Sequence, residues 1–190
     1  MTDDARARLA PYRAGRYKPG DEEAEFLYRV YKLLREAPDK MSKHAKKRTF
    51  ENAADGVHSW KVVCISEAAL EHLATSGTTK TLRRAHEPSR EWRYQEVFGE
   101  GARDWTQSEL MTHFFEHDIC ALVTSAENGK NVSGDWSPLH AVPEDILCKG
   151  SFAIYAREKD VTWAKKLWNS VVAERTLAAG DANGHAGHTG

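Results

Sequence analysis

The amino-acid sequence predicts one α/β or α+β domain, in which a small mixed sheet packs against about five helices. Three observations support this fold class. The length of 190 residues suits one hydrophobic core. A hydrophobic content of 41% provides enough apolar surface for folding. Helical apolar stripes alternate along the chain with short β-branched runs. We expect an N-terminal extension over residues 1–20, a single globular domain over 21–178 and a disordered, Gly-containing tail over 179–190.

The first half of the domain is predicted to run helix, loop, strand, helix. Residues 21–37 place apolar side chains on one helical stripe and are followed by a proline. Residues 39–59 lack such a period, so we expect a loop there. Residues 60–65 are short and β-branched, and Ser66 is placed to cap a helix over 67–76. This segment therefore predicts a strand that leads directly into a helix.

Two helices and a buried strand are predicted next. Pro88 and Ser89 start a helix that extends to about Phe98. A capping box, Thr106 with Glu109, starts a helix that runs through residue 116. Residues 119–124 are continuously apolar, which is typical of a strand covered on both faces.

The last part of the domain is predicted to be a loop, a strand and a long helix. Residues 125–137 are polar and contain an Asn-Gly pair, so we expect a loop. Residues 151–156 read as another strand, and Asp160 as the cap of a helix that packs on the sheet. Three or four strands do not decide whether the sheet is parallel.

Composition excludes several function classes. No stretch approaches the roughly 18 apolar residues of a membrane span, and residues 1–20 carry two Asp and four Arg where a signal peptide is apolar. Cys64, Cys120 and Cys148 form no CxxC pair and suit a reducing compartment. We therefore expect a cytoplasmic protein without a membrane partner. The absence of a Gly-rich phosphate loop, a GxSxG elbow and a dinucleotide fingerprint argues against NTP hydrolysis, serine esterase chemistry and NAD use.

The charge distribution predicts a phosphate-bearing partner. Residues 28–93 contain 14 Lys and Arg against 8 Asp and Glu, whereas residues 94–160 contain 5 against 12. Arginines interleaved with Trp92 and Tyr94 suit nucleic acid, because guanidinium groups bind phosphate and flat rings stack on bases. The alternative is a solvated loop followed by an exposed helix face. The cations expected to contact DNA or RNA are Lys43, Lys46, Lys47, Arg48, Arg83, Arg84, Arg90 and Arg93.

A metal-dependent active site is predicted where a helix end precedes the buried strand. Glu116 and Asp118 there, with Asn128 beyond the strand, provide the oxygen ligands that Mg²⁺ or Mn²⁺ prefers. His86 and His117 are the predicted catalytic residues, with His86 as base because neighbouring arginines favour its neutral imidazole. The resulting hypothesis is a small nuclease of restriction, defence or mobile-element type. It requires His86 and the acidic helix end to share one cleft.

Other readings of these residues stay open. In a non-enzymatic nucleic-acid or protein binding module, the same cations would hold phosphates and both histidines would be structural. His113 to His117 fits H-x-x-E-H, a zinc hydrolase pattern that would use Zn²⁺ instead. The PD-(D/E)xK pattern fails because no Lys follows an acidic residue at the required offset, and the doubled His of HNH enzymes is missing. The oligomeric state, a homodimer included, is left open by the sequence.

Overall fold

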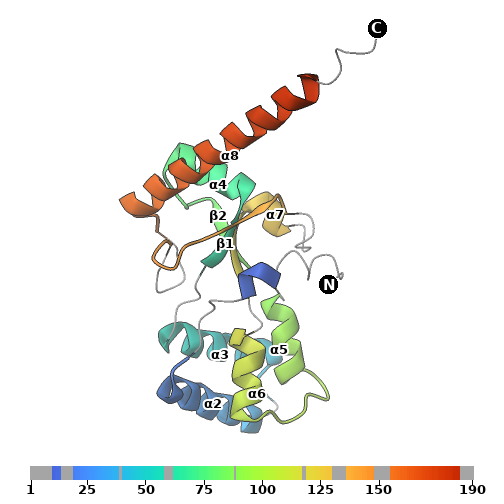
Figure 1. The fold of residues 1–190 in the computed structure, drawn as a ribbon. Coiled ribbons are helices and arrows are strands. Elements are labelled where there is room, and N and C mark those ends of the chain that lie inside the picture. The colour runs from blue at the N-terminus through green and yellow to red at the C-terminus, as the bar shows by residue number, and fades with distance from the viewer. Residues whose placement is uncertain are drawn as a thin grey trace.

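A mixed four-stranded sheet organises the part of the chain that the structure describes (Figure 1). This computed structural model describes residues 10–13, 19–38, 40–57, 62–87, 89–116, 119–129, 136–147 and 155–184. The strands are β1 (Val62–Ser66), β2 (Leu82–Glu87), β3 (Ile119–Thr124) and β4 (Leu139–Ala141), in the order β2-β3-β1-β4. β1 and β3 are parallel, whereas β2 and β4 are antiparallel to their neighbours. In this order β2 and β4 are the edge strands of the sheet that the described residues form.

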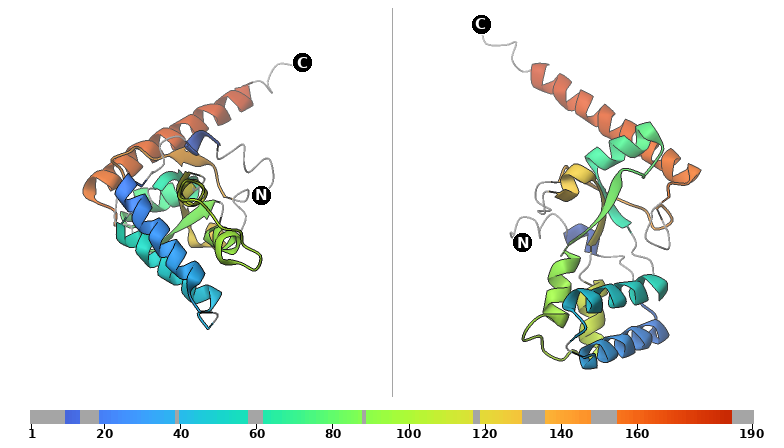
Figure 2. Two further views of the ribbon diagram at one scale, coloured as in Figure 1. Left: turned by 90° about the horizontal axis from the view of Figure 1, so that it is seen from below. Right: turned by 180° about the vertical axis from the view of Figure 1, so that it is seen from behind.

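Helices lie at both ends of the sheet. α4 (Glu67–Ser76) and α8 (Glu158–Gly184) pack together beside the strands, and the far end of α8 projects beyond the other elements (Figure 1). A helical group lies at the opposite end, where α2 and α3 run side by side (Figure 2). It consists of α2 (Asp21–Glu36), α3 (Lys43–Val57), α5 (Arg90–Phe98), α6 (Gln107–Met111) and a π-helical turn, η2 (Thr112–Glu116). The short α7 (Ser125–Gly129) and η1 (Ala10–Arg13) complete the described elements.

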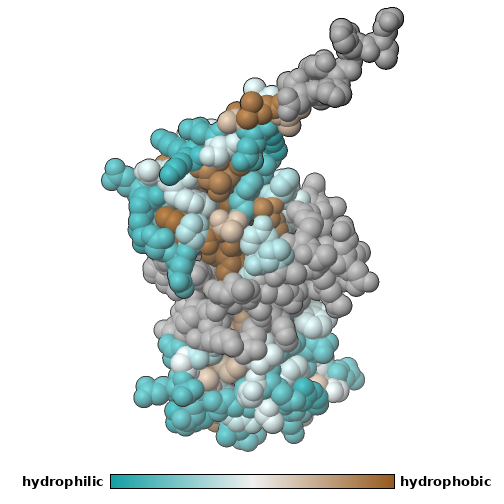
Figure 3. Space-filling view, viewed as in Figure 1, coloured by the Kyte–Doolittle hydropathy of each residue, from teal (hydrophilic) through white to brown (hydrophobic). Residues whose placement is uncertain are grey.

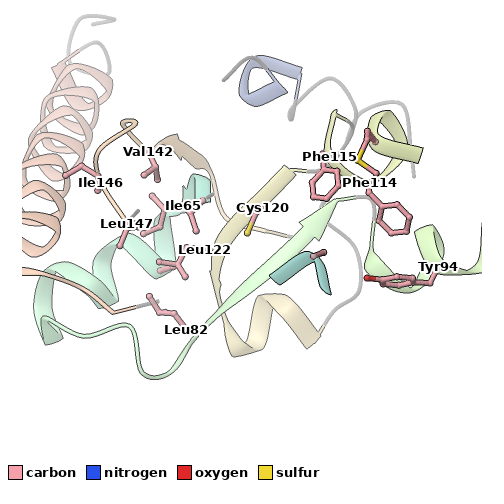
Figure 4. Packing of buried hydrophobic residues seen from close by; sticks show 14 of the residues in the cluster. Ile65, Leu82, Tyr94, Phe114, Phe115, Cys120, Leu122, Val142, Ile146 and Leu147 are labelled. Carbon is pink, nitrogen blue, oxygen red and sulfur yellow. The ribbon is translucent and has the colours of Figure 1, made fainter. Parts of the chain in front are cut away.

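One hydrophobic core connects the sheet to the helical group. Figure 4 shows Ile65 and Leu122 of the central strands facing Leu147, while Phe114 and Tyr94 lie at the helical end. All five side chains belong to the same buried cluster, so the described chain forms a single α+β domain. Seen from the direction of Figure 1, the helical group has a mainly hydrophilic surface, and apolar residues gather around α4 and α8 (Figure 3).

Local capping explains where several helices begin and end. Ser66 accepts a hydrogen bond from the Ala69 N–H at the start of α4, and Ser89 does the same for Trp92 in α5. The predicted capping box is confirmed: Thr106 Oγ1 accepts from the Glu109 N–H, and Glu109 accepts from the Thr106 N–H. Gly77 ends α4 with a φ of +69°, a left-handed conformation that favours glycine.

Five elements differ from the sequence prediction. α3 forms where a loop was expected, because Phe50 and Ala54, four residues apart, are both buried against the core. β2 and β4 were not predicted, and α7 lies within the expected loop over 125–137. α8 continues to Gly184, so the expected disordered tail is helical over residues 179–184.

Other predicted segments are only partly described. Residues 151–154 of the predicted strand over 151–156 lie outside the described residues, and Tyr155 and Ala156 are not in a strand. Part of the predicted N-terminal extension contacts the sheet, since Tyr12 Oη donates a 2.7 Å hydrogen bond to the Leu139 carbonyl. None of the described helices combines the length and the apolar character that crossing a lipid bilayer requires.

Candidate nucleic-acid interface

A pocket with a volume of about 620 Å³ lies beside the edge strand β2. We call it the β2 pocket. Its polar lining consists of Thr78, Thr79, Lys80, Arg83, Arg84 and Tyr155. Leu82 and Leu122, from β2 and β3, contribute apolar lining. Two of the arginines predicted to bind phosphate therefore share one pocket.

The turn before β2 fixes the position of this lining. Gly77 ends α4, and the Leu82 N–H donates to the Thr79 carbonyl at 3.0 Å to start the strand. Ser125 of α7 donates to the Thr81 carbonyl at 2.9 Å, which ties the turn to the end of β3. These bonds hold the loop on the sheet, so the pocket wall has a defined shape.

The β2 pocket is cationic. Lys80, Arg83 and Arg84 line it, and no Asp or Glu is among its described lining residues. Neither Lys80 nor Arg83 forms an ion pair with any residue that the structure describes. Arg83 is exposed, and its Nη1 donates at 3.0 Å only to the neighbouring Leu82 carbonyl. Its charge is thus available to an anion from solvent.

His86 lies at the other end of β2. Its Nε2 lies 2.9 Å from Nη2 of Arg90, and Nη1 of Arg90 lies 3.7 Å from Oε1 of Glu51. Because arginine can only donate, Nε2 accepts and a neutral His86 carries its proton on Nδ1. The imidazole is half-buried where β2, α3 and α5 meet. Arg90 is therefore engaged in this cluster and does not line the β2 pocket.

The strand register separates His86 from Asn128. His86 pairs with Cys120, whereas Leu82 pairs with Thr124, four residues further along β3. At about 3.3 Å per residue this is a distance of roughly 13 Å, and Asn128 lies beyond it, exposed on α7. The prediction that His86 and Asn128 contribute to one pocket is not supported by this arrangement, because they lie at opposite ends of the strand pair.

The acidic helix end is described only in part. Glu116 ends the π-helical turn, and its side chain, like all of His117 and Asp118, lies outside the described residues. Ile119, the residue after Asp118, pairs with Glu87 next to His86. Among the residues that the structure describes, no three His, Cys, Asp or Glu side chains form a group that could hold a metal ion.

Arg93 is a correction to the predicted phosphate contacts. Its side chain is fully buried, and Nη1 donates a 2.7 Å hydrogen bond to the Phe114 carbonyl. Arg93 belongs to the buried side of α5 with Tyr94, Val97 and Phe98, so its guanidinium faces the core and not solvent.

The cations of α3 form a second, partly engaged group. Lys47 pairs with Glu91, and its Nζ lies 5.3 Å from the centre of the Tyr94 ring. Lys46 Nζ donates to the Ala37 carbonyl at 3.4 Å. Lys43 and Arg48 are exposed on the same helix. α3 thus presents fewer available charges than its sequence suggests.

His113 of the zinc-like string is buried in an aromatic environment. Its Nε2 donates to the Arg93 carbonyl at 3.2 Å, and its ring centre lies 4.6 Å from that of Trp105. The backbone over residues 112–116 is π-helical, so the spacing of an α-helix does not apply there. The hydrogen bond of Nε2 and the burial of the ring favour a structural role for His113.

Glu127 accepts more hydrogen bonds than any other carboxylate of the described chain, and it is not among the site residues predicted from sequence. Oε2 accepts from Ser66 Oγ at 2.7 Å and from the N–H and hydroxyl of Thr124, both at 2.9 Å. Oε1 accepts from the N–H of Ser137 at 3.0 Å and from its hydroxyl at 2.7 Å. Thr124-x-x-Glu127 is a capping box that could have been recognised. With five bonds accepted, Glu127 joins three segments and has no capacity left for a ligand.

Comparisons with known proteins identify no relative of this chain. No protein-family model, no curated protein sequence and no solved structure matches it.

Proposed function

We propose that this protein binds nucleic acid, with phosphates held in the β2 pocket. The observation that supports this most directly is the lining by Lys80, Arg83 and Arg84 without an opposing carboxylate among the described residues. Guanidinium groups match phosphate oxygens in a bidentate geometry, and the nearby threonine hydroxyls add neutral donors. A cytoplasmic location is part of this proposal.

The test is a charge reversal in the pocket. We expect the double variant R83E/R84E to bind a fluorescein-labelled 20-mer of DNA or RNA at least about tenfold more weakly, measured by fluorescence anisotropy at about 0.1 M salt. The matched control is R29E/K32E, which reverses two exposed charges on α2 in the helical group. Equal losses in both variants, or no binding by the wild type, would refute the proposal.

A second candidate is that the protein also hydrolyses the nucleic acid with Mg²⁺ or Mn²⁺. Two observations favour this candidate. His86 is half-buried beside Arg90. Ile119, the residue after Asp118, pairs with Glu87 next to His86. A phosphate that drew Arg90 away would leave the Nε2 lone pair of His86 for a water molecule.

Incubation with labelled DNA and RNA in Mg²⁺, Mn²⁺ or EDTA tests this candidate. We expect metal-dependent cleavage that His86→Ala lowers by at least about 100-fold without changing the melting temperature. His44→Ala removes an exposed histidine of α3 and is the control. Binding without any cleavage would leave the binding module as the function.

A further inference from the structure

Tyr155 is an exposed aromatic ring on the wall of the β2 pocket. About 70% of its surface is accessible to solvent, although it lies beside Lys80, Arg83 and Arg84. Proteins that bind single-stranded nucleic acid combine aromatic rings, on which bases stack, with a positively charged groove that binds the phosphates. The position of this side chain therefore suggests a function.

The backbone next to Tyr155 is firmly held. Ala156 packs against the main core. Arg157 donates to Asp160 Oδ2 from its N–H at 2.8 Å and from Nε at 2.9 Å. Arg157 Nη2 also donates to the Asp145 carbonyl at 3.0 Å. Anchoring on both following residues limits the entropy that Tyr155 would lose when its ring stacks on a ligand.

We infer that the β2 pocket recognises single-stranded nucleic acid, with one unpaired base stacked on Tyr155 and the adjacent phosphate on Arg83 and Arg84. This inference rests on the proposed nucleic-acid binding and names the form of the ligand. In a duplex the base faces are stacked inside, so they cannot meet a ring in a pocket. A volume of about 620 Å³ lies in the usual range of pockets for small ligands, which suits a nucleotide and not a double helix.

The lining also indicates little selectivity among bases. Stacking tolerates every base because each has a π-face, and cations and hydroxyls bind the common backbone. Thr78, Thr79 and Lys80 line the pocket with the two arginines. None of these five residues carries a carboxylate, which would accept a hydrogen bond from a base amino group and so select particular bases. We therefore expect binding of both single-stranded DNA and RNA.

The experiment compares four ligands of equal length by anisotropy at one salt concentration. They are a 15-mer of thymidine, a 15-mer of uridine, a 15-mer of abasic sites with the same phosphates, and a mixed-sequence duplex. The wild type should bind the two single strands at least about tenfold more tightly than the abasic strand. Tyr155→Ala should weaken binding to the single strands about tenfold and leave the abasic strand and the duplex unchanged, while Tyr155→Phe should remain within about twofold of the wild type. Phe26→Ala, which removes an exposed ring on α2, is the matched control.

The outcomes separate this inference from the proposed function. If R83E/R84E weakens binding but Tyr155→Ala does not, or if the duplex binds as tightly as the single strands, the pocket binds phosphate and the single-strand inference is wrong. If no ligand binds, or if R83E/R84E binds normally, the proposed function itself fails. If Phe26→Ala weakens binding as much as Tyr155→Ala, the base does not stack in the β2 pocket and the inference is also wrong.

Discussion

At the scale of single residues, burial decides what a charged side chain can do. Arg83 and Arg93 are ten positions apart and were given the same role from sequence, but one is exposed at the pocket and the other is fully buried against Phe114. The presence of cations could be predicted from composition. Their orientation could not, because an arginine in a helix or strand gives no signal of the face on which it lies unless the neighbouring apolar pattern is clear.

Glu127 provides a prediction at this scale. Burial alone would raise the pKa of its carboxyl, but hydrogen bonds from Ser137, Ser66 and Thr124 lower the pKa to about 2. The ordinary value is 4.5, so the carboxylate stabilises the fold fully above about pH 4.5, and this contribution is lost as the pH falls toward 2. We expect Glu127→Gln to lower the free energy of unfolding at pH 7 by about 1–3 kcal/mol.

The pH dependence distinguishes this mechanism from simple loss of packing. In urea unfolding experiments, the difference between wild type and Glu127→Gln should shrink between pH 4.5 and pH 2. Glu71→Gln, on the exposed surface of α4, should change stability little at any pH. A difference that stays constant over this range would show that the ionised carboxylate is not what stabilises the fold.

At the scale of elements, the sequence predicts those with a strong pattern of their own. The apolar stripe of α2, the capped α4 and the continuous apolar run of β3 are all found in the structure. β2 was missed because only Leu82 and Ala85 of its six residues are buried, so its strand conformation depends on pairing with β3. The pocket was missed with it, since Arg83 and Arg84 come together with Tyr155 only through this pairing and the placement of α8.

The start of α8 is a testable element of the pocket. Asp160 is fully buried, and its Oδ1 accepts from the Leu147 N–H at 3.0 Å and from Arg157 Nη2 at 2.9 Å. We expect Asp160→Ala to destabilise the protein by about 1–3 kcal/mol and to speed amide hydrogen exchange in the first turns of α8. The same variant should weaken single-strand binding, because Arg157 no longer holds the chain beside Tyr155. The control is Glu158→Ala, which changes an exposed acid in the same turn and should leave amide hydrogen exchange unaltered. Faster amide exchange in both variants would contradict a specific role for Asp160.

At the scale of the whole molecule, the basic half of the sequence does not form one basic face. The eight cations predicted to contact nucleic acid divide among the β2 pocket, the surface of α3, the His86 cluster and the core. The predicted cleft, in which His86 would share a site with Glu116 and Asp118 before β3 and with Asn128 beyond it, would require the two ends of one strand to meet. Sequence separation does not show which end of β3 lies beside His86. Only the antiparallel register of β2 and β3 shows this.

This division of charge predicts a shallow salt dependence. For binding to a single strand, each phosphate neutralised contributes about −0.7 to the slope of log K against log salt. Three pocket cations therefore predict a slope of about −2 in a plot of log K against log salt, whereas all eight predicted contacts would give a slope between about −5 and −6. We expect anisotropy titrations of the wild type with the thymidine 15-mer, between about 50 and 300 mM salt, to give the shallow slope. The variant R83E/R84E should make the slope shallower still. The variant K43E/R48E on α3 should leave the slope unchanged. A slope steeper than about −4 that K43E/R48E reduces would mean that the strand runs along α3 as well, and that the β2 pocket is only one part of a longer binding surface.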